Sequence, residues 1–236
     1  MSDKASKWEA DRGARCTLST LPMPPSSRRI RAAYHHGDLR RALLEAAFQL
    51  LEEKGVGALS LREAARLTGV THQAPYRHFA DKTQLVAAVT EEGFRGLQEA
   101  MSAGVALHPD EPAARLEAAA VAYVTFAVRH PALFRLMFGE EIADKSAFPS
   151  LRAAADGMMA MLTTTIVEAQ RAGLLRPGDP LDLALAGWAM MHGLSSLLVE
   201  GPLARYPHGK QAPEVTARMA IRLLRAGLDA PPDTRR

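Results

Sequence analysis

The chain has 236 residues, of which 47% are hydrophobic, 23% charged and 6% aromatic, with a formal net charge of +3 at pH 7. These proportions are typical of a soluble globular protein, and the length suffices for one large or two small domains with a buried core. Valine, isoleucine and threonine form no alternating runs, whereas alanine, leucine, arginine and glutamate dominate, so an all-α fold is favoured. The single cysteine, Cys16, excludes a disulfide framework or a cysteine metal site and fits a reducing compartment.

Residues 1–33 form a polar, proline-containing segment without helical periodicity. They carry seven Lys/Arg against three Asp/Glu, whereas residues 34–82 carry seven against six and residues 83–236 carry fifteen against seventeen. The basic excess is therefore local to this segment. Two interpretations stay open. One is a disordered basic arm whose Arg28, Arg29 and Arg31 reach a DNA groove or backbone, and the other is a start codon assigned upstream of the real domain.

A first helix is predicted from about Asp38 to Lys54, followed by a pair of short helices in Ser60–Phe79, SLREAARLTGVTHQAPYRHF. Ser60 and Glu63 have the spacing of a capping box, and Gly69 suits a left-handed residue at the end of the first short helix. Thr71 is a good N-cap for the second, which we expect from His72 to about Phe79 with a slight distortion at Pro75. Two short helices joined by such a turn are typical of the helix-turn-helix, whose second helix enters the DNA major groove.

Downstream, capping residues and turns predict six further helices. Asp81 and Gln84 form a second capping box, which opens a helix to about Met101. The others are expected at about 113–129, 132–138, 149–172, 180–200 and 213–227. The expectation is therefore about nine helices: a three-helix helix-turn-helix domain over 34–96 and a larger helical domain over 97–236.

No segment is predicted to cross a membrane or to direct secretion. The longest apolar region, 183–199, is interrupted by His192, Ser195 and Ser196 and is shorter than the roughly 20 apolar residues that a bilayer requires. The first thirty residues lack the apolar stretch of a signal peptide. A cytoplasmic protein without a membrane partner is expected.

The run from Asp38 to about Arg95 closely resembles the DNA-binding domain of the TetR family of bacterial transcriptional regulators. The resemblance rests on RRALLEAAFQLLEEKGVGALSLREAARLTGVTHQAPYRHFADKTQLVAAV, with matching positions at Gly55, Leu59, Ser60, Arg62, Ala65, Gly69, Val70, Tyr76, His78, Phe79 and Lys82. The C-terminal part is similar to the branch of that family named for a Trp-His-Gly element. Here that element is WAMMHG at 188–193, and HPALFRLMF at 130–138 also matches the branch.

The resemblance implies which residues contact DNA. Contacts with base edges, flanking bases or nearby phosphates are expected on the second short helix, from His72, Gln73, Ala74, Tyr76, Arg77 and His78. Gln73 has the groups to bond adenine, and Ala74 suits a thymine methyl. Phosphate contacts are expected from Ser60, Arg62, Thr71 and Lys82. The alternative for each residue is a solvated polar side chain, and for Tyr76 a packing role, whereas Phe79 and Val70 are expected in the core.

A ligand cavity is predicted in the C-terminal domain, where seven of the ten methionines lie between Met137 and Met219. Its candidate lining is Tyr123, Phe126, Phe134, Met137, Met158, Met161, Trp188, Met191 and His192. Ordinary core packing is the alternative for each of these residues. His192 follows Trp188 by four residues and so shares its helical face, where it bonds either a ligand or a buried carbonyl.

The resemblance implies a DNA-binding transcriptional regulator without a cofactor, most simply a repressor. It would bind a palindromic operator as a homodimer through its last two long helices and be released by a small, largely apolar ligand. The alternatives are a regulator without a small-molecule effector, an activator, and a helical enzyme or ligand-binding module with a vestigial helix-turn-helix. The motifs of nucleophilic hydrolases, zinc proteases and P-loop enzymes are not found, so we expect no enzyme activity.

Overall fold

A computed structural model of the protein describes residues 39–228, and its α-helices confirm the all-α prediction. The predicted basic arm, its arginines and Asp38 lie outside the described residues. The eight α-helices are α1 (Leu39–Lys54), α2 (Leu61–Thr68), α3 (Lys82–Ala106), α4 (Pro112–Arg129), α5 (Pro131–Phe138), α6 (Pro149–Arg171), α7 (Pro180–Val199) and α8 (Pro213–Leu228). The sequence predicted about nine, and the difference lies in residues 72–79.

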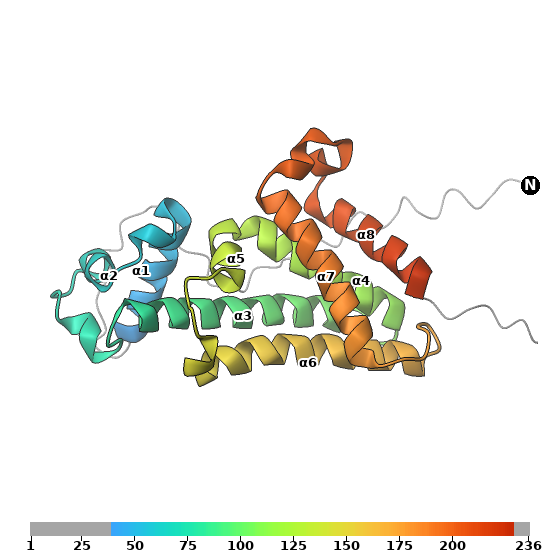
Figure 1. The fold of residues 1–236 in the computed structure, drawn as a ribbon, viewed down its shortest axis with the longest axis horizontal. Coiled ribbons are helices and arrows are strands. Elements are labelled where there is room, and N and C mark those ends of the chain that lie inside the picture. The colour runs from blue at the N-terminus through green and yellow to red at the C-terminus, as the bar shows by residue number, and fades with distance from the viewer. Residues whose placement is uncertain (1–38, 229–236) are drawn as a thin grey trace, which may run out of the picture.

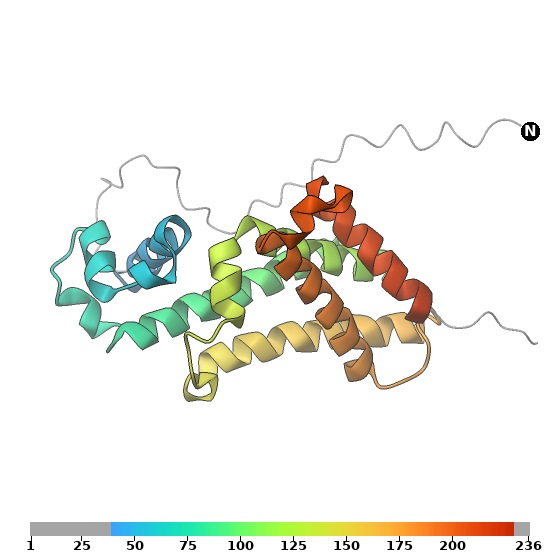
Figure 2. The ribbon, with the colours of Figure 1, turned by 45° about the horizontal axis from the view of Figure 1, so that its top comes forward.

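The long helix α3 connects two parts of the molecule (Figure 1). Helices α1 and α2 gather around its N-terminal end, and we call residues 39–89 the headpiece. Helices α4 and α6 pack along the rest of α3, and α7 and α8 lie against α4 (Figure 2). The domain boundary predicted at residues 96 and 97 therefore falls inside one continuous helix.

The core of the headpiece consists of the apolar faces of α1, α2 and α3. Leu43, Leu50, Leu59 and Leu85 are at most 1% exposed, and Phe79 is also buried. Each fully buried leucine contributes about 1.5–3 kcal/mol by leaving water, so these residues fix how the short elements sit on α3. The Arg40 guanidinium lies 5.4 Å from the centroid of the Phe79 ring and covers it from the outside.

Helix α2 begins and ends as its sequence predicts, except in one arm of the capping box. The Ser60 hydroxyl accepts the backbone N–H of Glu63 at 3.1 Å, and Gly69 ends the helix at φ 72°. The Glu63 carboxylate was expected to accept a hydrogen bond from the N–H of Ser60. It instead accepts one from Nε of Arg66 at 2.9 Å. Val70, expected in the core, is only half-buried.

The prediction of an α-helix from His72 to Phe79 is wrong. Residues Ala74–Arg77 form a 3-10 helix, and Gln73 rather than Thr71 is its N-cap. The cause is Pro75, which has no N–H to give to the Thr71 carbonyl four residues back. That carbonyl accepts the N–H of Ala74 at 3.0 Å instead, and Gln73 and Pro75 continue the tighter pattern by accepting from Tyr76 and His78.

Helix α3 extends five residues beyond its predicted end at Met101, whereas Asp81 and Asp179 cap α3 and α7 as predicted. Asp81 accepts the N–H of Gln84 at 2.9 Å, but the Gln84 side chain accepts the N–H of Ala80 at 2.9 Å rather than that of Asp81, as the predicted capping box requires. Asp179 accepts the N–H of Leu181 at 2.8 Å, directly before Pro180 in the first helical position.

Candidate nucleic-acid interface and ligand cavity

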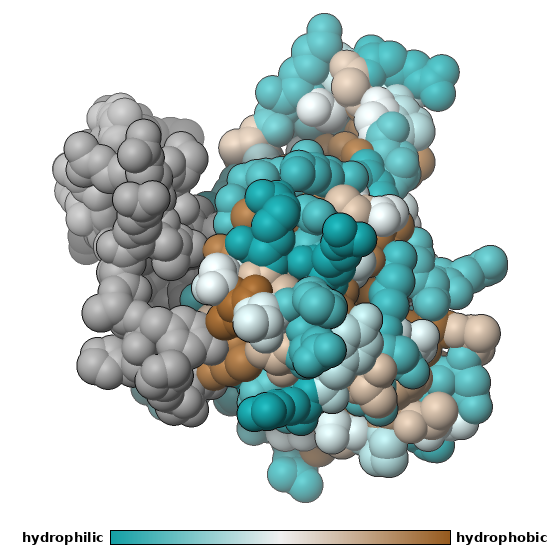
Figure 3. All heavy atoms as spheres, turned by 90° about the vertical axis from the view of Figure 1, so that its left-hand side faces the viewer, coloured by the Kyte–Doolittle hydropathy of each residue, from teal (hydrophilic) through white to brown (hydrophobic). Residues whose placement is uncertain are grey.

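Residues 73–78, which we call the recognition turn, lie at the free end of the headpiece. Gln73, Tyr76, Arg77 and His78 are exposed, and Tyr76 is 56% accessible to solvent. Residues three apart in a 3-10 helix lie on the same side, so Gln73 and Tyr76 share one face. Pro75 is buried and anchors the turn to the headpiece. Viewed from this end, the surface is mainly hydrophilic (Figure 3).

The other predicted DNA contacts are arranged around this turn. Thr71 and His72 are exposed between α2 and the turn, and Ala74 is half-buried. Arg62 and Lys82 are exposed in the first turns of α2 and α3, where backbone N–H groups favour anions. The Ser60 hydroxyl is already used as the cap of α2, so the group it offers a phosphate is its neighbouring backbone.

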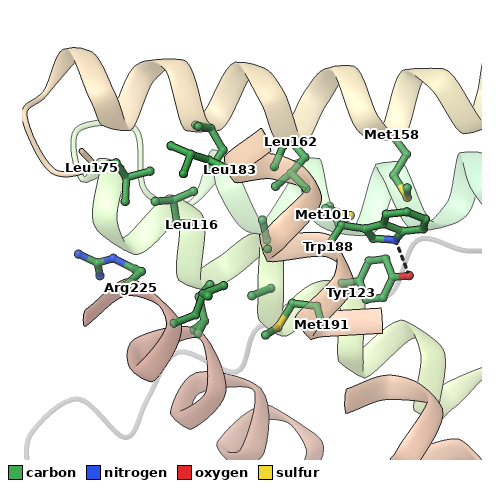
Figure 4. A pocket seen from close by; sticks show the side chains of 17 residues that line it. Met101, Leu116, Tyr123, Met158, Leu162, Leu175, Leu183, Trp188, Met191 and Arg225 are labelled. Carbon is green, nitrogen blue, oxygen red and sulfur yellow. Dashed lines mark hydrogen bonds between the residues drawn. The ribbon is translucent and has the colours of Figure 1, made fainter. Parts of the chain in front are cut away.

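A cavity lies between α3, α4, α6, α7 and α8, and 17 residues line it (Figure 4). The space open to the centre of a water-sized molecule is about 50 Å³, within about 630 Å³ of non-atom space that includes the open mouth. Arg225 at one end is the charged residue of the lining, and Tyr123 and Trp188 form the other end. The remaining lining side chains are aliphatic or methionine.

Four of the nine residues predicted for the ligand cavity line it, and five do not. Tyr123, Met158, Trp188 and Met191 are in the lining. Those that lie elsewhere are Phe126, Phe134, Met137, Met161 and His192. Phe126 packs its ring on His130 with centroids 5.0 Å apart, and Met161 accepts the Ser102 hydroxyl at its sulfur. Phe134 and Met137 belong to α5, and the His192 ring packs on the Phe134 ring, with centroids 5.2 Å apart. Their ligand-binding role stays a prediction.

Sequence reasoning missed most of the lining, which comes from helices whose apolar faces look alike in sequence. The missed residues include Met101, Leu116, Leu162, Ile166, Leu183, Gly187, Ile221 and Arg225. Helical periodicity identifies which face of a helix points inward, but it does not show where two packed helices leave a space between them. The one available signal was Arg225, a charge on the otherwise apolar side of the last helix.

A chain of hydrogen bonds closes the Trp188 end of the cavity. Nε1 of Trp188 donates to the Tyr123 hydroxyl at 3.1 Å, and that hydroxyl lies 3.0 Å from Nδ1 of His192. The Tyr123 hydroxyl therefore links Trp188 with His192, and the tautomer of the His192 ring decides which of the two side chains donates in the Tyr123–His192 bond. Burial lowers the pKa of His192 and raises the pKa of Tyr123, and both shifts favour the neutral forms of the two side chains.

A carboxylate on α4 fastens α8 beside the cavity. Glu117 accepts Nη1 of Arg218 at 2.5 Å and Nε of Arg222 at 3.2 Å. Burial alone would raise the pKa of Glu117, but the hydrogen bonds and charges of Arg222 and Arg218 outweigh it and leave the pKa below its ordinary value. No cluster of three or more metal-ligating side chains occurs within residues 39–228.

Two family descriptions match the chain. "Bacterial regulatory proteins, tetR family" covers residues 43–89, and "Tetracyclin repressor-like, C-terminal domain" covers residues 116–224. The first match contains the recognition turn, and the second contains the cavity end at Tyr123 and Trp188.

Solved structures match most of the chain. A protein of unknown function from Rhodococcus sp. RHA1 is 37% identical with a TM-score of 0.74, and the match covers 84% of this chain and 98% of that one. A regulatory protein of the tetR family from Rhodococcus RHA1 is 23% identical, with a TM-score of 0.63 over 82% and 98% of the two chains. The TetR family regulator PfmR from Thermus thermophilus is 21% identical, with a TM-score of 0.60 over 85% and 100%. At 23% and 21% identity, the last two matches show similarity of fold alone. With both family descriptions matched and the headpiece in place, the chain belongs to the TetR family of DNA-binding transcriptional regulators.

Proposed function

We propose that the protein is a homodimeric repressor that binds a palindromic operator and is released by a small, largely apolar molecule in the cavity. The observation that carries this proposal is the pairing of an exposed recognition turn with an apolar cavity in the same chain. Neither feature is needed for folding alone, because an exposed tyrosine and an unfilled apolar space both leave hydrophobic stabilisation unused.

The recognition turn supports base reading by few side chains. Gln73 and Tyr76 share one exposed face, so we assign them to base edges, with His72 and Ala74 beside them. Arg77, His78 and Lys82 carry the charge or hydrogen-bonding groups suited to phosphates, together with Thr71, Arg62 and the backbone at Ser60. In a dimer, two such turns would lie about one helical repeat of DNA, roughly 34 Å, apart.

An apolar stripe on α7 and α8 supports dimerisation. Every fourth residue of α7 is apolar and exposed: Leu181, Leu185, Ala189, Gly193 and Leu197. Small residues at the middle of this stripe allow a second helix to approach closely. On α8, Val215 and Leu223 are 50% and 65% exposed. Within residues 39–228, α7 is the helix that is long and apolar enough by composition to cross a membrane. A second copy over the same stripe would cover these residues without a membrane.

The size of the cavity supports a ligand that changes the protein's shape. Space of about 50 Å³ for water-sized centres accommodates only a few waters. Sites for drug-sized ligands occupy about 300–1,000 Å³, so such an occupant would have to push the lining helices apart. The affinity that the dimer loses for DNA would then equal the ligand's preference for the opened state.

DNA binding by matched variants tests the proposal. We expect the wild type to bind the DNA upstream of its own gene, measured by electrophoretic mobility shift and fluorescence anisotropy, with affinity that falls as salt rises. The Gln73→Ala/Tyr76→Ala double variant should lose sequence-selective binding. The control is Gln211→Ala/Tyr206→Ala, which makes the same changes at exposed residues of the α7–α8 connection. Absence of salt-sensitive, selective binding, or equal binding by both double variants, would reject the proposal. A reporter fusion separates repression from activation.

Gly187 offers a test of the cavity that does not require knowing the ligand. It lines the cavity on α7, and a Cβ placed there would meet no atom within 4 Å. Gly187→Leu should therefore place its side chain in the cavity and abolish the thermal stabilisation produced by apolar molecules found in a screen of the wild type. Gly187→Ala, which adds one methyl, should retain it. Equal responses from both variants would show that the screened molecules bind elsewhere.

A further inference from the structure

A second and more open space, which we call the junction cleft, lies where the headpiece meets the start of α6. Helix α6 begins beside the N-terminal part of α3 (Figure 1). Residues of α1, the recognition turn, α3 and the first turn of α6 line the cleft, among them Arg40, His78, Ala88 and Leu151. None of its lining residues borders the ligand cavity. The volume open to the centre of a water-sized molecule is about 210 Å³, compared with about 50 Å³ in the ligand cavity.

Small side chains on α3 leave the junction cleft open. The lining residues of α3 follow the spacing of one helical face, i, i+3, i+4 and i+7, and are Gln84, Ala87, Ala88 and Glu91. The two alanines in the middle of this face end at Cβ, so they cannot reach across to α6. On the α6 side, Leu151 is buried and Phe148 is half-buried. The inner part of the cleft is therefore apolar and has room for one ring.

The polar groups around the cleft favour a ligand that accepts hydrogen bonds. The Arg40 guanidinium lies over the Phe79 ring, 5.4 Å from its centroid, which holds it beside the cleft. The side-chain oxygen of Gln84 already accepts a backbone N–H, so Gln84 offers a ligand its NH2 donor. The Glu91 carboxylate accepts Nη2 of Arg95 at 2.5 Å, which balances its charge. Arg40 then gives the cleft a positive charge, and an anion is the ligand that this charge attracts.

We propose that the junction cleft binds a small aromatic monocarboxylate, with its ring packed between Ala88 and Phe148 and its carboxylate paired with Arg40. A guanidinium can donate two parallel N–H bonds to one carboxylate, which fixes the orientation of the ligand. A single ring suits this space, because sites for drug-sized ligands occupy about 300–1,000 Å³. The proposal goes beyond the proposed function, since the site is separate from the ligand cavity and its occupation needs no DNA.

The occupant would lie next to one of the proposed phosphate contacts. His78 lines the cleft, is exposed and is the last residue of the recognition turn. A carboxylate beside His78 would repel a DNA phosphate at the same place. This effect on DNA rests on the proposed function, whereas binding of the carboxylate does not.

Fluorine NMR of 4-fluorobenzoate with the full chain tests the binding. The ligand signal should broaden on addition of wild-type protein, and acetate at equal concentration should not reverse the broadening because it lacks the ring. Arg40→Gln should weaken binding about tenfold, the effect of losing a hydrogen bond to a charged group. 4-Fluorobenzamide, which has the ring without the charge, should bind more weakly by a similar factor. Arg41→Gln removes the same charge from the next residue, which is exposed and outside the lining, and should bind as the wild type does.

A further variant decides between the two spaces in the molecule. Arg225 is the charged residue of the ligand cavity and so the alternative partner for a carboxylate. Arg225→Gln should leave the affinity unchanged, and loss of binding in this variant overturns the proposal. Absence of binding to the wild type, displacement by acetate, or equal affinity in Arg40→Gln and Arg41→Gln also overturns it. If Arg40→Gln does not fold, by circular dichroism, Ser150→Asp adds a negative charge at an exposed lining residue and must likewise weaken binding.

The effect on DNA is measured separately by fluorescence anisotropy. 4-Fluorobenzoate should weaken DNA binding by the wild type more than acetate at equal concentration, which controls for ionic strength. In Arg40→Gln the two salts should act alike. Equal effects of the two salts on the wild type overturn the predicted repulsion at His78. Failure of the wild type to bind DNA rejects the proposed function and leaves the NMR test of the cleft intact.

Discussion

Tyr123→Phe removes one oxygen atom that joins two helices at the end of the cavity. The Tyr123 side chain is 2% exposed, and its hydroxyl bonds both Trp188 Nε1 and His192 Nδ1. The phenylalanine ring keeps the packing, so the change isolates these two hydrogen bonds. Each is worth about 0.5–1.5 kcal/mol net, which gives an expected loss of about 1–3 kcal/mol in the free energy of unfolding. For a chain of this size, the melting temperature falls by roughly 2–4 °C per kcal/mol.

Urea unfolding followed by circular dichroism measures this loss, at one fixed protein concentration because the proposed dimerisation would add to stability. Tyr206→Phe is the matched control. It makes the same change on a ring that is 53% exposed and should alter stability by less than about 0.5 kcal/mol. If Tyr123→Phe lies within about 0.5 kcal/mol of the wild type, the hydrogen-bonded chain through Tyr123 does not hold α4 and α7 together, and the reasoning fails.

Three further changes test other parts of the structure. Gly69→Ala should destabilise the protein by about 1 kcal/mol through its φ of 72° alone, since a Cβ there meets nothing within 4 Å. Gly57→Ala, equally open and without a positive φ, should cost less in the same urea experiment. Under the proposed function, Leu185→Glu on the α7 stripe should convert a dimer to monomer in analytical ultracentrifugation, whereas Leu107→Glu, at a leucine 63% exposed after α3, should not. Because burial holds the pKa of His192 below its ordinary 6.5, its share of stability is complete above about pH 6.5 and is lost as pH falls through the lowered pKa. The urea midpoint should therefore fall less steeply with decreasing pH in His192→Gln than in the wild type.

The elements that sequence predicted well are those fixed by local chemistry. Ser60, Asp81 and Asp179 each cap a helix with a hydrogen bond between neighbours in sequence, and Gly69 satisfies a backbone requirement that does not depend on the rest of the fold. The recognition turn lies at the opposite extreme. Pro75 was visible, but we expected it to distort an α-helix only slightly, whereas the segment is a 3-10 helix in which Pro75 is buried.

The lining of the cavity was beyond sequence reasoning for a related reason. Met137 and Met101 are the same residue type, and each lies on the apolar face of a helix. Met137 nevertheless packs against Gly93, whereas Met101 faces the cavity. Which apolar residue borders empty space depends on how helices cross, and crossing angles come from the whole set of contacts.

The continuity of α3 has a mechanical consequence for a protein that reads DNA. Its 25 residues form one unbroken rod from Lys82 in the headpiece to Ala106 beside α4. At 1.5 Å per residue the rod is about 38 Å long, so a tilt of about 5° at one end displaces the other by roughly 3 Å. A displacement of that size in each of two copies would change the span between their recognition turns by up to about 6 Å, a large fraction of the roughly 12 Å width of the major groove. Under the proposed function, helix α3 would therefore act as a lever, and small adjustments of packing around the cavity would suffice to take the two headpieces out of register with an operator.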